Sequence, residues 1–137
     1  MIIGITGTDG AGKGAVVEYL KTKGFTHYSA RELIVDEIKK QGLEVHRPNM
    51  KLVGNAMRLE FGGDMLITKA VHQKEADGVT DCIVESVRTV DETDTLHSLE
   101  GLLLAVDADQ RLRYERIYSR GSETDQITFE QFVEQDL

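Results

Sequence analysis

The most constraining feature of the sequence is a glycine-rich segment near its beginning, which reads GTDGAGKG over residues 7–14. It fits the pattern G-x-x-x-x-G-K and lies between an apolar run at residues 1–5 and a segment with helical spacing at residues 12–23. Glycines allow the backbone angles that turn successive N–H groups toward one anion, and a helix start adds its positive dipole end. The segment therefore predicts a cradle for nucleotide phosphates, in which Lys13 reaches the β- and γ-phosphates.

This cradle lacks one usual component. Ser or Thr normally follows the lysine and its hydroxyl binds Mg²⁺, but here Gly14 and then Ala15 follow. Nucleotide binding is therefore indicated more strongly than catalysis. Mg²⁺ is expected to be held mainly by phosphates and water, and no protein ligand for a metal is predicted. The residues predicted to bind the nucleotide are Gly7, Thr8, Asp9, Gly10, Ala11, Gly12, Lys13, Gly14 and Ala15.

Apolar runs and helical segments alternate along the chain. Strands are predicted at residues 1–5, 82–87 and 102–106, with a short extended piece at 25–28. A capping box at Ser29 predicts a helix from that residue to 42. Pro48 breaks the chain, and Asn49 is predicted to cap a helix at residues 50–61. Further helices are predicted at residues 12–23, 64–76, 91–98, 109–120 and 128–135. Continuous apolar runs are typical of strands covered on both faces. The order predicts an α/β fold of three layers, a parallel sheet with helices on both faces.

Length and composition limit the alternatives. A chain of 137 residues is expected to form a single domain, residues 1–137. The net charge of −8 argues against a broad nucleic-acid surface, so the few basic residues must be concentrated locally to bind phosphate. One cysteine excludes an internal disulfide, and the four histidines show no ligand spacing. No apolar run approaches a membrane span, and the first residues leave no room for a signal peptide, so a cytoplasmic protein is predicted.

The string GTDGAGKG resembles the loop of nucleoside monophosphate kinases, and nearly the whole chain resembles a group of small P-loop kinases related to adenylate kinase. The supporting strings are RPNM at residues 47–50, GNAMRLEFG at 54–62, ESVR at 85–88 and the arginines of 113–121. Ala15 departs from adenylate kinases, which usually have Thr there. Similar segments occur fused to deoxycytidylate deaminases, but this chain has no Cys/His pattern of a deaminase. The resemblance implies a P-loop NTPase fold with acceptor-side helices at about residues 30–76 and a lid at about residues 113–127.

The resemblance and the charge pattern together predict the acceptor site. Arg58 matches an arginine of the acceptor-side helices, and a solvent-facing helical arginine is the equal alternative. Glu85 lies late in the predicted buried strand at residues 82–87 and Arg88 follows its end, where open α/β sheets bind ligands. Glu85 could hold a Mg²⁺-bound water or an acceptor hydroxyl. Asp9 could contact the acceptor sugar or a metal-bound water, or only stabilise the turn. The predicted acceptor contacts are Arg31, Arg58, Glu85, Arg88 and Arg113.

Three arginines mark the predicted lid. At about 100° per residue, Arg113, Arg116 and Arg120 fall on a stripe roughly 60° wide. Phosphoryl transfer spreads negative charge over the transferred group, and arginines on a closing segment can stabilise that charge once water is excluded. Arg116 and Arg120 are therefore predicted to be catalytic together with Lys13, and an exposed basic helix face is the alternative.

These observations predict a phosphotransferase that moves the γ-phosphate of ATP or GTP to a nucleoside or deoxynucleoside monophosphate. A kinase similar to dephospho-coenzyme A kinase and a non-catalytic nucleotide sensor are the alternatives. Related kinases continue past the lid into another strand and a final helix. Without these, the strand at residues 102–106 would keep an unpaired edge, and three alternatives stay open: the chain is truncated, a further segment of it follows, or a partner subunit such as a second copy of the chain covers the edge. No nucleic-acid or membrane partner is expected, and the acceptor and the donor base are not determined.

Overall fold

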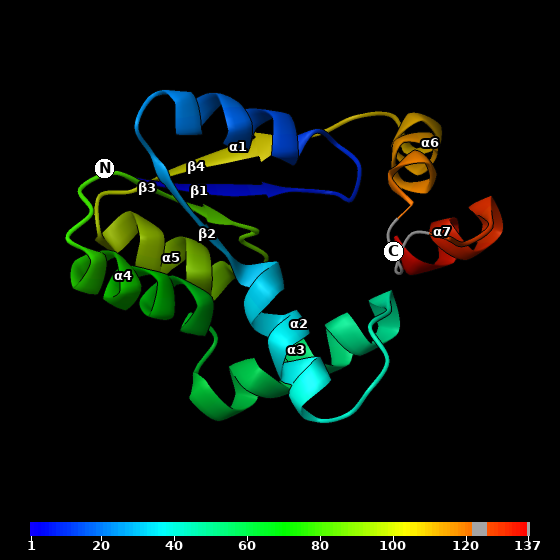
Figure 1. Ribbon diagram of the computed structural model, residues 1–137, viewed down its shortest axis with the longest axis horizontal. Coiled ribbons are helices and arrows are strands. Elements are labelled where there is room, and N and C mark those ends of the chain that lie inside the picture. Colours follow the sequence, from blue (N-terminus) through cyan, green and yellow to red (C-terminus); the bar gives the residue numbers. More distant parts are fainter. Residues whose placement is uncertain (122–125, 137) are drawn as a thin grey trace.

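The computed structural model describes residues 1–121 and 126–136, and its centre is one sheet of four parallel strands (Figure 1). The strands are β1 (Ile2–Gly7), β2 (Thr26–Ser29), β3 (Cys82–Glu85) and β4 (Leu102–Val106), and their order across the sheet is β2-β3-β1-β4. The first strand thus lies inside the sheet, and all crossovers pass through helices. The predicted parallel α/β sheet is confirmed.

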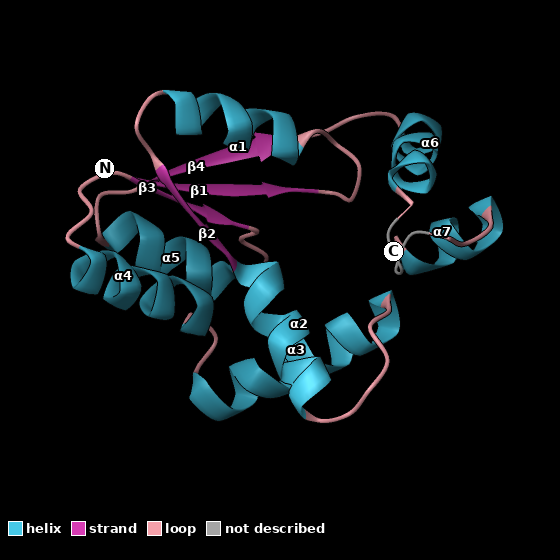
Figure 2. Ribbon diagram, in the orientation of Figure 1, coloured by secondary structure: helices cyan, strands magenta, loops and turns pink. Residues whose placement is uncertain are grey.

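Helices cover both faces of the sheet (Figure 2). On one face, Ile3, Ile5 and Ile83 pack against Val17 of α1 (Lys13–Thr22). On the other face, Val84 and Val87 pack against α4 (Met65–Asp77), and α5 (Val90–Ser98) lies beside α4. Because the central strands are buried between these helices, the three-layer architecture is confirmed. Within the described residues, every helix is too short or too polar to span a membrane.

Four further helices surround the carboxyl ends of the strands. The pair α2 (Ala30–Lys40) and α3 (Arg47–Phe61) has a small core of its own, in which Ile34 and Ile38 pack with Val53 and Met57. The helices α6 (Gln110–Arg120) and α7 (Phe129–Gln135) lie on another side of the same region (Figure 1). Ligands of open α/β sheets bind at this end, so these helices form the walls of any site there.

The start of α3 differs from the prediction. The helix begins at Arg47, and its cap is His46, whose Nδ1 accepts a hydrogen bond from the Asn49 N–H at 3.2 Å. Asn49 therefore lies inside the helix, and its predicted capping role is wrong. Pro48 does not break the helix, because a proline in the first turn lacks only an N–H that would have no helical partner. This extension places Arg47 on a helix at the edge of the site.

Strand β4 also differs from the prediction of a strand covered on both faces. It is the last strand of the sheet, and Leu102 and Leu104 are 51% and 39% exposed. Both lie on the face that α1 covers, since they pair in register with Ile3 and Ile5 of β1. The helix reaches the central strands but leaves this edge open. Cover by a second copy of the chain stays a prediction.

That prediction can be tested by sedimentation equilibrium. If β4 pairs with its counterpart in a second copy, Leu104→Lys should convert a concentration-dependent dimer to a monomer, because a lysine on an edge strand opposes pairing. Leu59→Lys is the control, since Leu59 is 89% exposed on α3, away from the sheet edge. A wild-type protein that remains monomeric at all concentrations would exclude this mode of association.

Candidate functional site

The loop between β1 and α1 has the backbone of an anion cradle. Gly10 and Gly12 have φ angles of 81° and 111°, in the region that favours glycine. A Cβ atom on Gly10 would lie 2.5 Å from the carbonyl oxygen of Arg113, so α6 packs directly against the loop. Gly12 precedes α1 without providing a side-chain cap, which leaves the first N–H groups of the helix available to an anion. The loop therefore fits the phosphates of a nucleotide.

Lys13 lies at the start of α1 with its side chain folded onto this loop. It is 9% exposed, and its Nζ donates hydrogen bonds of 3.0 Å to the carbonyl oxygens of Gly7 and Thr8. Burial lowers the pKa of Lys13, although the nearby Asp9 carboxylate opposes the shift. In the described part of the chain, the hydrogen bonds of this buried ammonium go to neutral carbonyls. It would gain by exchanging them for an anion, because hydrogen bonds between two charged groups are stronger.

A cavity of about 590 Å³ opens beside Lys13, between the loop, α2, α3 and the end of β3. Among the described residues, its charged lining is mostly basic, with two carboxylates, Asp9 and Glu85. The basic lining residues are Lys13, Arg31, Arg47, Lys51, Arg58, Arg88 and Arg120. In a protein of net charge −8, this is the local concentration of cations that binding a phosphorylated molecule requires. The volume is within the usual range for sites that bind small molecules.

Asp9 joins two of these arginines at the junction of loop and cavity. Its Oδ2 lies 3.3 Å from Nε of Arg47, and its Oδ1 lies 3.6 Å from NH2 of Arg88. Burial opposes ionisation of Asp9, but Arg88, Arg47 and Lys13 outweigh it and lower the pKa of this carboxyl. Arg47 was not predicted as a site residue. The signal that could have indicated it is Pro48, which is favourable in the first turn of a helix and so indicates a start near Arg47.

Glu85 ends β3 and lines the cavity, as predicted from the end of a buried strand. Its Oε2 lies 2.8 Å from Nε2 of His27 in β2. The hydrogen bond from His27 lowers the pKa of Glu85, although burial opposes the shift, and the charges of Lys13 and Arg88 lower it further. His27 was one of the four histidines without ligand spacing, so no site role was predicted for it. Its contact with Glu85 depends on strand register, which the sequence does not show.

Arg58 reaches the cavity from α3 but is paired with a buried carboxylate. Its Nε donates to Oε1 of Glu92 at 3.0 Å, and Glu92 is fully buried at the start of α5. The other oxygen of Glu92 accepts the backbone N–H of Arg88 at 2.7 Å, so the pair supports the segment that carries Arg88. Because the Arg58 side chain is only 12% exposed, the solvent-facing alternative is wrong. A direct contact with the acceptor stays a prediction.

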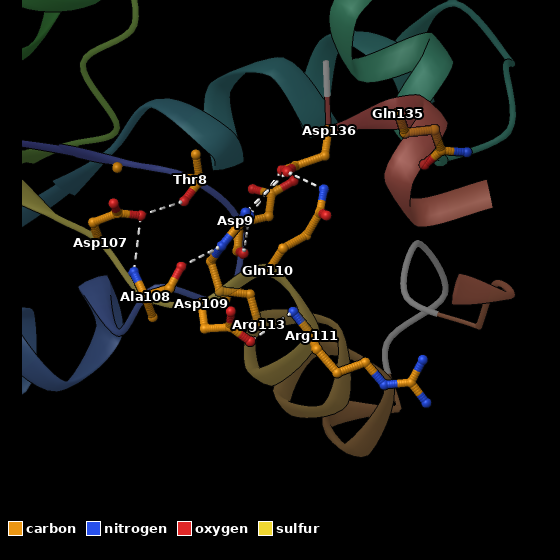
Figure 3. A network of polar contacts seen from close by, with 12 residues as sticks. Thr8, Asp9, Asp107, Ala108, Asp109, Gln110, Arg111, Arg113, Gln135 and Asp136 are labelled. Atoms are coloured by element: carbon orange, nitrogen blue, oxygen red, sulfur yellow. Dashed lines mark hydrogen bonds and ion pairs between the residues drawn. The ribbon is translucent and has the colours of Figure 1, made fainter. Parts of the chain in front are cut away.

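The three arginines predicted to form the stripe on α6, Arg113, Arg116 and Arg120, have different surroundings, and Figure 3 shows those of Arg113. Arg113 is buried and binds Asp136 through both guanidinium amines, at 2.8 and 2.9 Å, and the carbonyl oxygen of Asp9 at 3.3 Å. In this conformation Arg113 joins α6 to the loop and to the end of α7, and it does not line the cavity. Arg116 donates to the carbonyl oxygen of Gly10 at 3.1 Å, and Arg120 lines the cavity. Two of the three thus lie beside the loop or the cavity, and their catalytic role stays a prediction. Residues 122–125 of the predicted lid lie outside the described residues.

Helix α7 closes another side of the cavity. Gln135 at its end lines the cavity, and its carbonyl oxygen accepts a 2.7 Å hydrogen bond from Nζ of Lys51 on α3. A lysine at the carboxyl end of a helix is favourable, because it complements the helix dipole. The contact connects α7 to the helices on the other side of the cavity.

Comparison with known proteins identifies the family. The AAA domain family AAA_18 matches residues 3–137. The chain belongs to this family. Similar proteins include a UPF0200 protein of Thermococcus kodakarensis, 31% identical over 142 residues that cover 99% of this AAA-domain protein and 77% of the relative. Another is a UPF0200 protein of Methanocaldococcus jannaschii, 33% identical over 141 residues that cover 100% of this chain and 71% of the relative.

The crystal structure of TT1252 from Thermus thermophilus is similar in fold, with a TM-score of 0.58 over 98% of this chain and 78% of that one. Because the two sequences are 21% identical, this likeness shows the fold alone. The predicted P-loop kinase-like family is confirmed, while the UPF0200 names indicate no substrate.

The position after Lys13 offers a test of the missing metal ligand. A Cβ atom on Gly14 of this AAA-domain protein would meet no atom within 4 Å, so a larger side chain fits there. Gly14→Ser should strengthen Mg²⁺-dependent ATP binding about fivefold, or ~1 kcal/mol, because a hydroxyl can then bind the metal. Titration calorimetry with and without Mg²⁺ measures the effect.

Gly14→Ala is the matched control for this substitution. It removes the unfavourable glycine from α1 without adding a hydroxyl, so it should stabilise the fold and leave the Mg²⁺ effect unchanged. Equal Mg²⁺ effects in the serine and alanine variants would mean that position 14 does not face the metal.

Proposed function

We propose that this chain is a nucleotide-dependent phosphotransferase that moves the γ-phosphate of ATP or GTP to a nucleoside or deoxynucleoside monophosphate. The observation that carries the proposal is the basic cavity beside the phosphate cradle, with Lys13 at the boundary between them. A protein that only hydrolysed its nucleotide would need no second anion site. The cavity supports an acceptor that carries a phosphate of its own.

The donor phosphates would be bound by the loop and by Lys13. The N–H groups at the start of α1 and the backbone of Gly10 and Gly12 supply donors to the phosphate oxygens. Mg²⁺, when bound to the donor phosphates, supplies further positive charge to the transferred group. Among the described residues that line the cavity, Asp9 and Glu85 are the carboxylates near Lys13, so they would hold the waters bound to Mg²⁺.

The acceptor phosphate would be bound by Arg47 and Arg88. The two guanidinium groups share the Asp9 carboxylate, which holds them close together and keeps them oriented. Arginine suits this role, because its planar fork binds phosphate oxygens in pairs. Arg47 thereby supplies an acceptor contact from α3, in addition to the contacts predicted from the resemblance.

The reaction itself needs positioning and charge rather than an acid or a base. An oxygen of the acceptor phosphate attacks the γ-phosphorus, and the bond from that phosphorus to the β–γ bridging oxygen breaks, which releases the nucleoside diphosphate. Lys13, Arg116 and Arg120 lie at the loop and the cavity, where they would stabilise the charge on the transferred group. The monophosphate becomes a second diphosphate.

A panel of nucleoside and deoxynucleoside monophosphates, assayed with ATP or GTP and Mg²⁺, tests the proposal. Dephospho-coenzyme A belongs in the same panel, because the Glu85 carboxylate could accept the proton of an acceptor hydroxyl. Transfer to at least one monophosphate is the expected result. Transfer to none of the acceptors, with slow hydrolysis alone, would overturn the kinase function.

A second comparison separates a kinase from a nucleotide sensor. Joint replacement of Arg116 and Arg120 by alanine should remove transfer while nucleotide binding persists. Arg111→Ala is the matched control on the same helix, since Arg111 is exposed and its ion pair is with Glu115, away from the cavity lining. Tight binding without turnover in the wild-type protein would favour the sensor.

A further inference from the structure

The site contains one histidine that touches a cavity carboxylate without lining the cavity itself. Strand register places His27 opposite Ile83, so Glu85, two residues further along β3, is its diagonal neighbour on the same face of the sheet. Long side chains at such diagonal positions are within reach of each other. The resulting contact is 2.8 Å between Nε2 of His27 and Oε2 of Glu85.

Both partners are held in place by their surroundings. His27 and Glu85 are 24% and 22% exposed, and the strands that carry them are paired to each other by parallel hydrogen bonding. Among the described residues that line the cavity, Glu85 is present and His27 is not. The imidazole therefore contacts the carboxylate from outside the cavity, and any effect of His27 on a bound molecule must act through Glu85.

Glu85 faces cations that compete for it. Lys13 and Arg88 line the same cavity and attract its charge. A carboxylate without a fixed partner would turn toward either cation and occupy a group that the phosphates need. The hydrogen bond from His27 on β2 gives Oε2 of Glu85 a fixed partner that is not one of these cations.

We propose that His27 is a positioning residue of the site, whose Nε2–H holds the Glu85 carboxylate in one orientation at the boundary between the phosphate cradle and the acceptor cavity. The inference rests on the proposed function, in which Glu85 holds a water on the donor's metal or an acceptor hydroxyl. Either use needs a carboxylate at a constant place, since small displacements of a reacting or orienting group are costly. His27 fixes the position of the Glu85 carboxylate from outside the cavity.

The arrangement requires one particular form of the imidazole. An ionised carboxylate only accepts hydrogen bonds, so the Nε2 atom of His27 must carry a proton, whether the ring is neutral or charged. The opposite neutral tautomer would place a lone pair against the carboxylate. The ¹⁵N shifts of the His27 ring report the tautomer in the free protein and need no turnover.

Kinetics on four variants tests the positioning role. His27→Ala should lower the turnover number by about 10-fold to 100-fold, the usual range for a residue behind a directly acting one, with nucleotide affinity changed by less than about threefold. His27→Gln should restore most of the rate, because its amide N–H can take the place of Nε2–H. In a Glu85→Gln background, His27→Ala should have no further effect, because two residues acting as a unit are not additive.

Tyr28→Phe is the matched control in the same strand. Its hydroxyl bonds to Asp77 at 2.8 Å and its ring packs against the other face of the sheet, so the change perturbs β2 without touching Glu85. It should leave turnover unchanged. If His27 had a purely structural role, His27→Ala and Tyr28→Phe would lower the turnover number to a similar extent, and His27→Gln would not restore it.

The outcomes separate this inference from the proposed function. Absence of transfer by the wild-type protein would reject the function, while the tautomer measurement would still be informative. A wild-type protein that transfers phosphate, together with an equally active His27→Ala variant, would overturn the inference alone. An Nδ1–H tautomer at neutral pH, or full additivity of the His27 and Glu85 substitutions, would also overturn it.

Discussion

Lys13→Met is expected to lower phosphoryl transfer by about 10²-fold to 10³-fold, the usual effect of removing one preorganised donor to a developing charge. Methionine keeps the length of the buried stem, so the loop and α1 should stay folded. The loss follows from the position of Nζ, which lies 3.0 Å from two carbonyl oxygens of the cradle and is the loop's only lysine. Transfer rates and ATP affinity, measured on the same preparations, report the change.

Lys21→Met is the control for this substitution. Lys21 lies on the same helix, and its side chain is exposed with an ion pair to Glu18 only three residues away. It should behave as the wild type in both measurements. A Lys13→Met variant that kept full activity and ATP affinity would mean that the loop does not bind the donor phosphates.

The second large effect is expected on stability, from Asp136→Ala. This change leaves the Arg113 guanidinium, 7% exposed, without its carboxylate partner. Loss of one member of a buried ion pair typically costs about 3 to 5 kcal/mol, because the remaining charge stays buried and unbalanced. We expect a fall of about 3 kcal/mol in the free energy of unfolding, near the lower limit, since Arg113 keeps its bonds to the carbonyl oxygens of Ala108 and Asp9.

Urea unfolding measures this loss, and Asp94→Asn is the control. Asp94 is exposed on α5, so its replacement should change the free energy of unfolding by less than about 0.5 kcal/mol. Replacing Arg113 with Met and Asp136 with Leu together should recover part of the stability, because no buried charge then remains unpaired. Equal stability of the wild type and Asp136→Ala would mean that the ion pair in Figure 3 does not hold α7 in place.

Acid titration provides a second measure of the same ion pair. The hydrogen bonds from Arg113 lower the pKa of Asp136 in the folded state, although burial opposes the shift. The unfolded chain therefore binds a proton at a higher pH, near the ordinary aspartate value of about 4. The stabilisation is fully present above that value and is lost as the pH falls through the lower folded pKa. Asp136→Asn should flatten this part of the stability profile, while Asp9 and Glu85, whose pKa values are also lowered, keep the remaining slope.

The elements of the fold that depend on local pattern could be predicted. The apolar runs became β1, β3 and β4, and the cap at Ser29 was confirmed by a hydrogen bond from the Glu32 N–H. Such features depend on neighbours within about four residues, so a single sequence contains their cause. The exposure of β4 was not predictable in the same way. Its unpaired edge was expected from the resemblance and agrees with the order β2-β3-β1-β4, but the exposure of its face depends on how far α1 extends across the sheet.

The residues of the candidate site also fall into those that the sequence predicts and those that only the fold shows. Glu85 and Arg88 could be placed, because the carboxyl ends of parallel strands are where ligands bind. Arg47 and His27 were missed. Arg47 meets Asp9 across 38 positions of sequence, and His27 meets Glu85 across 58. Contacts between residues so far apart in the sequence leave no periodic pattern, so the sequence did not indicate them.

The phosphate cradle was thus readable from residues 7–14, because its function depends on backbone angles and on one lysine that lie together in the chain. The partner of each charged side chain was not readable there. Arg113 appeared to belong to one stripe with Arg116 and Arg120, yet it is bound to Asp136 and to the loop. Helical periodicity gives the direction of a side chain around its own helix, whereas its partner depends on what packs against that helix. Packing follows from the whole core, so the assignment of each arginine required the fold.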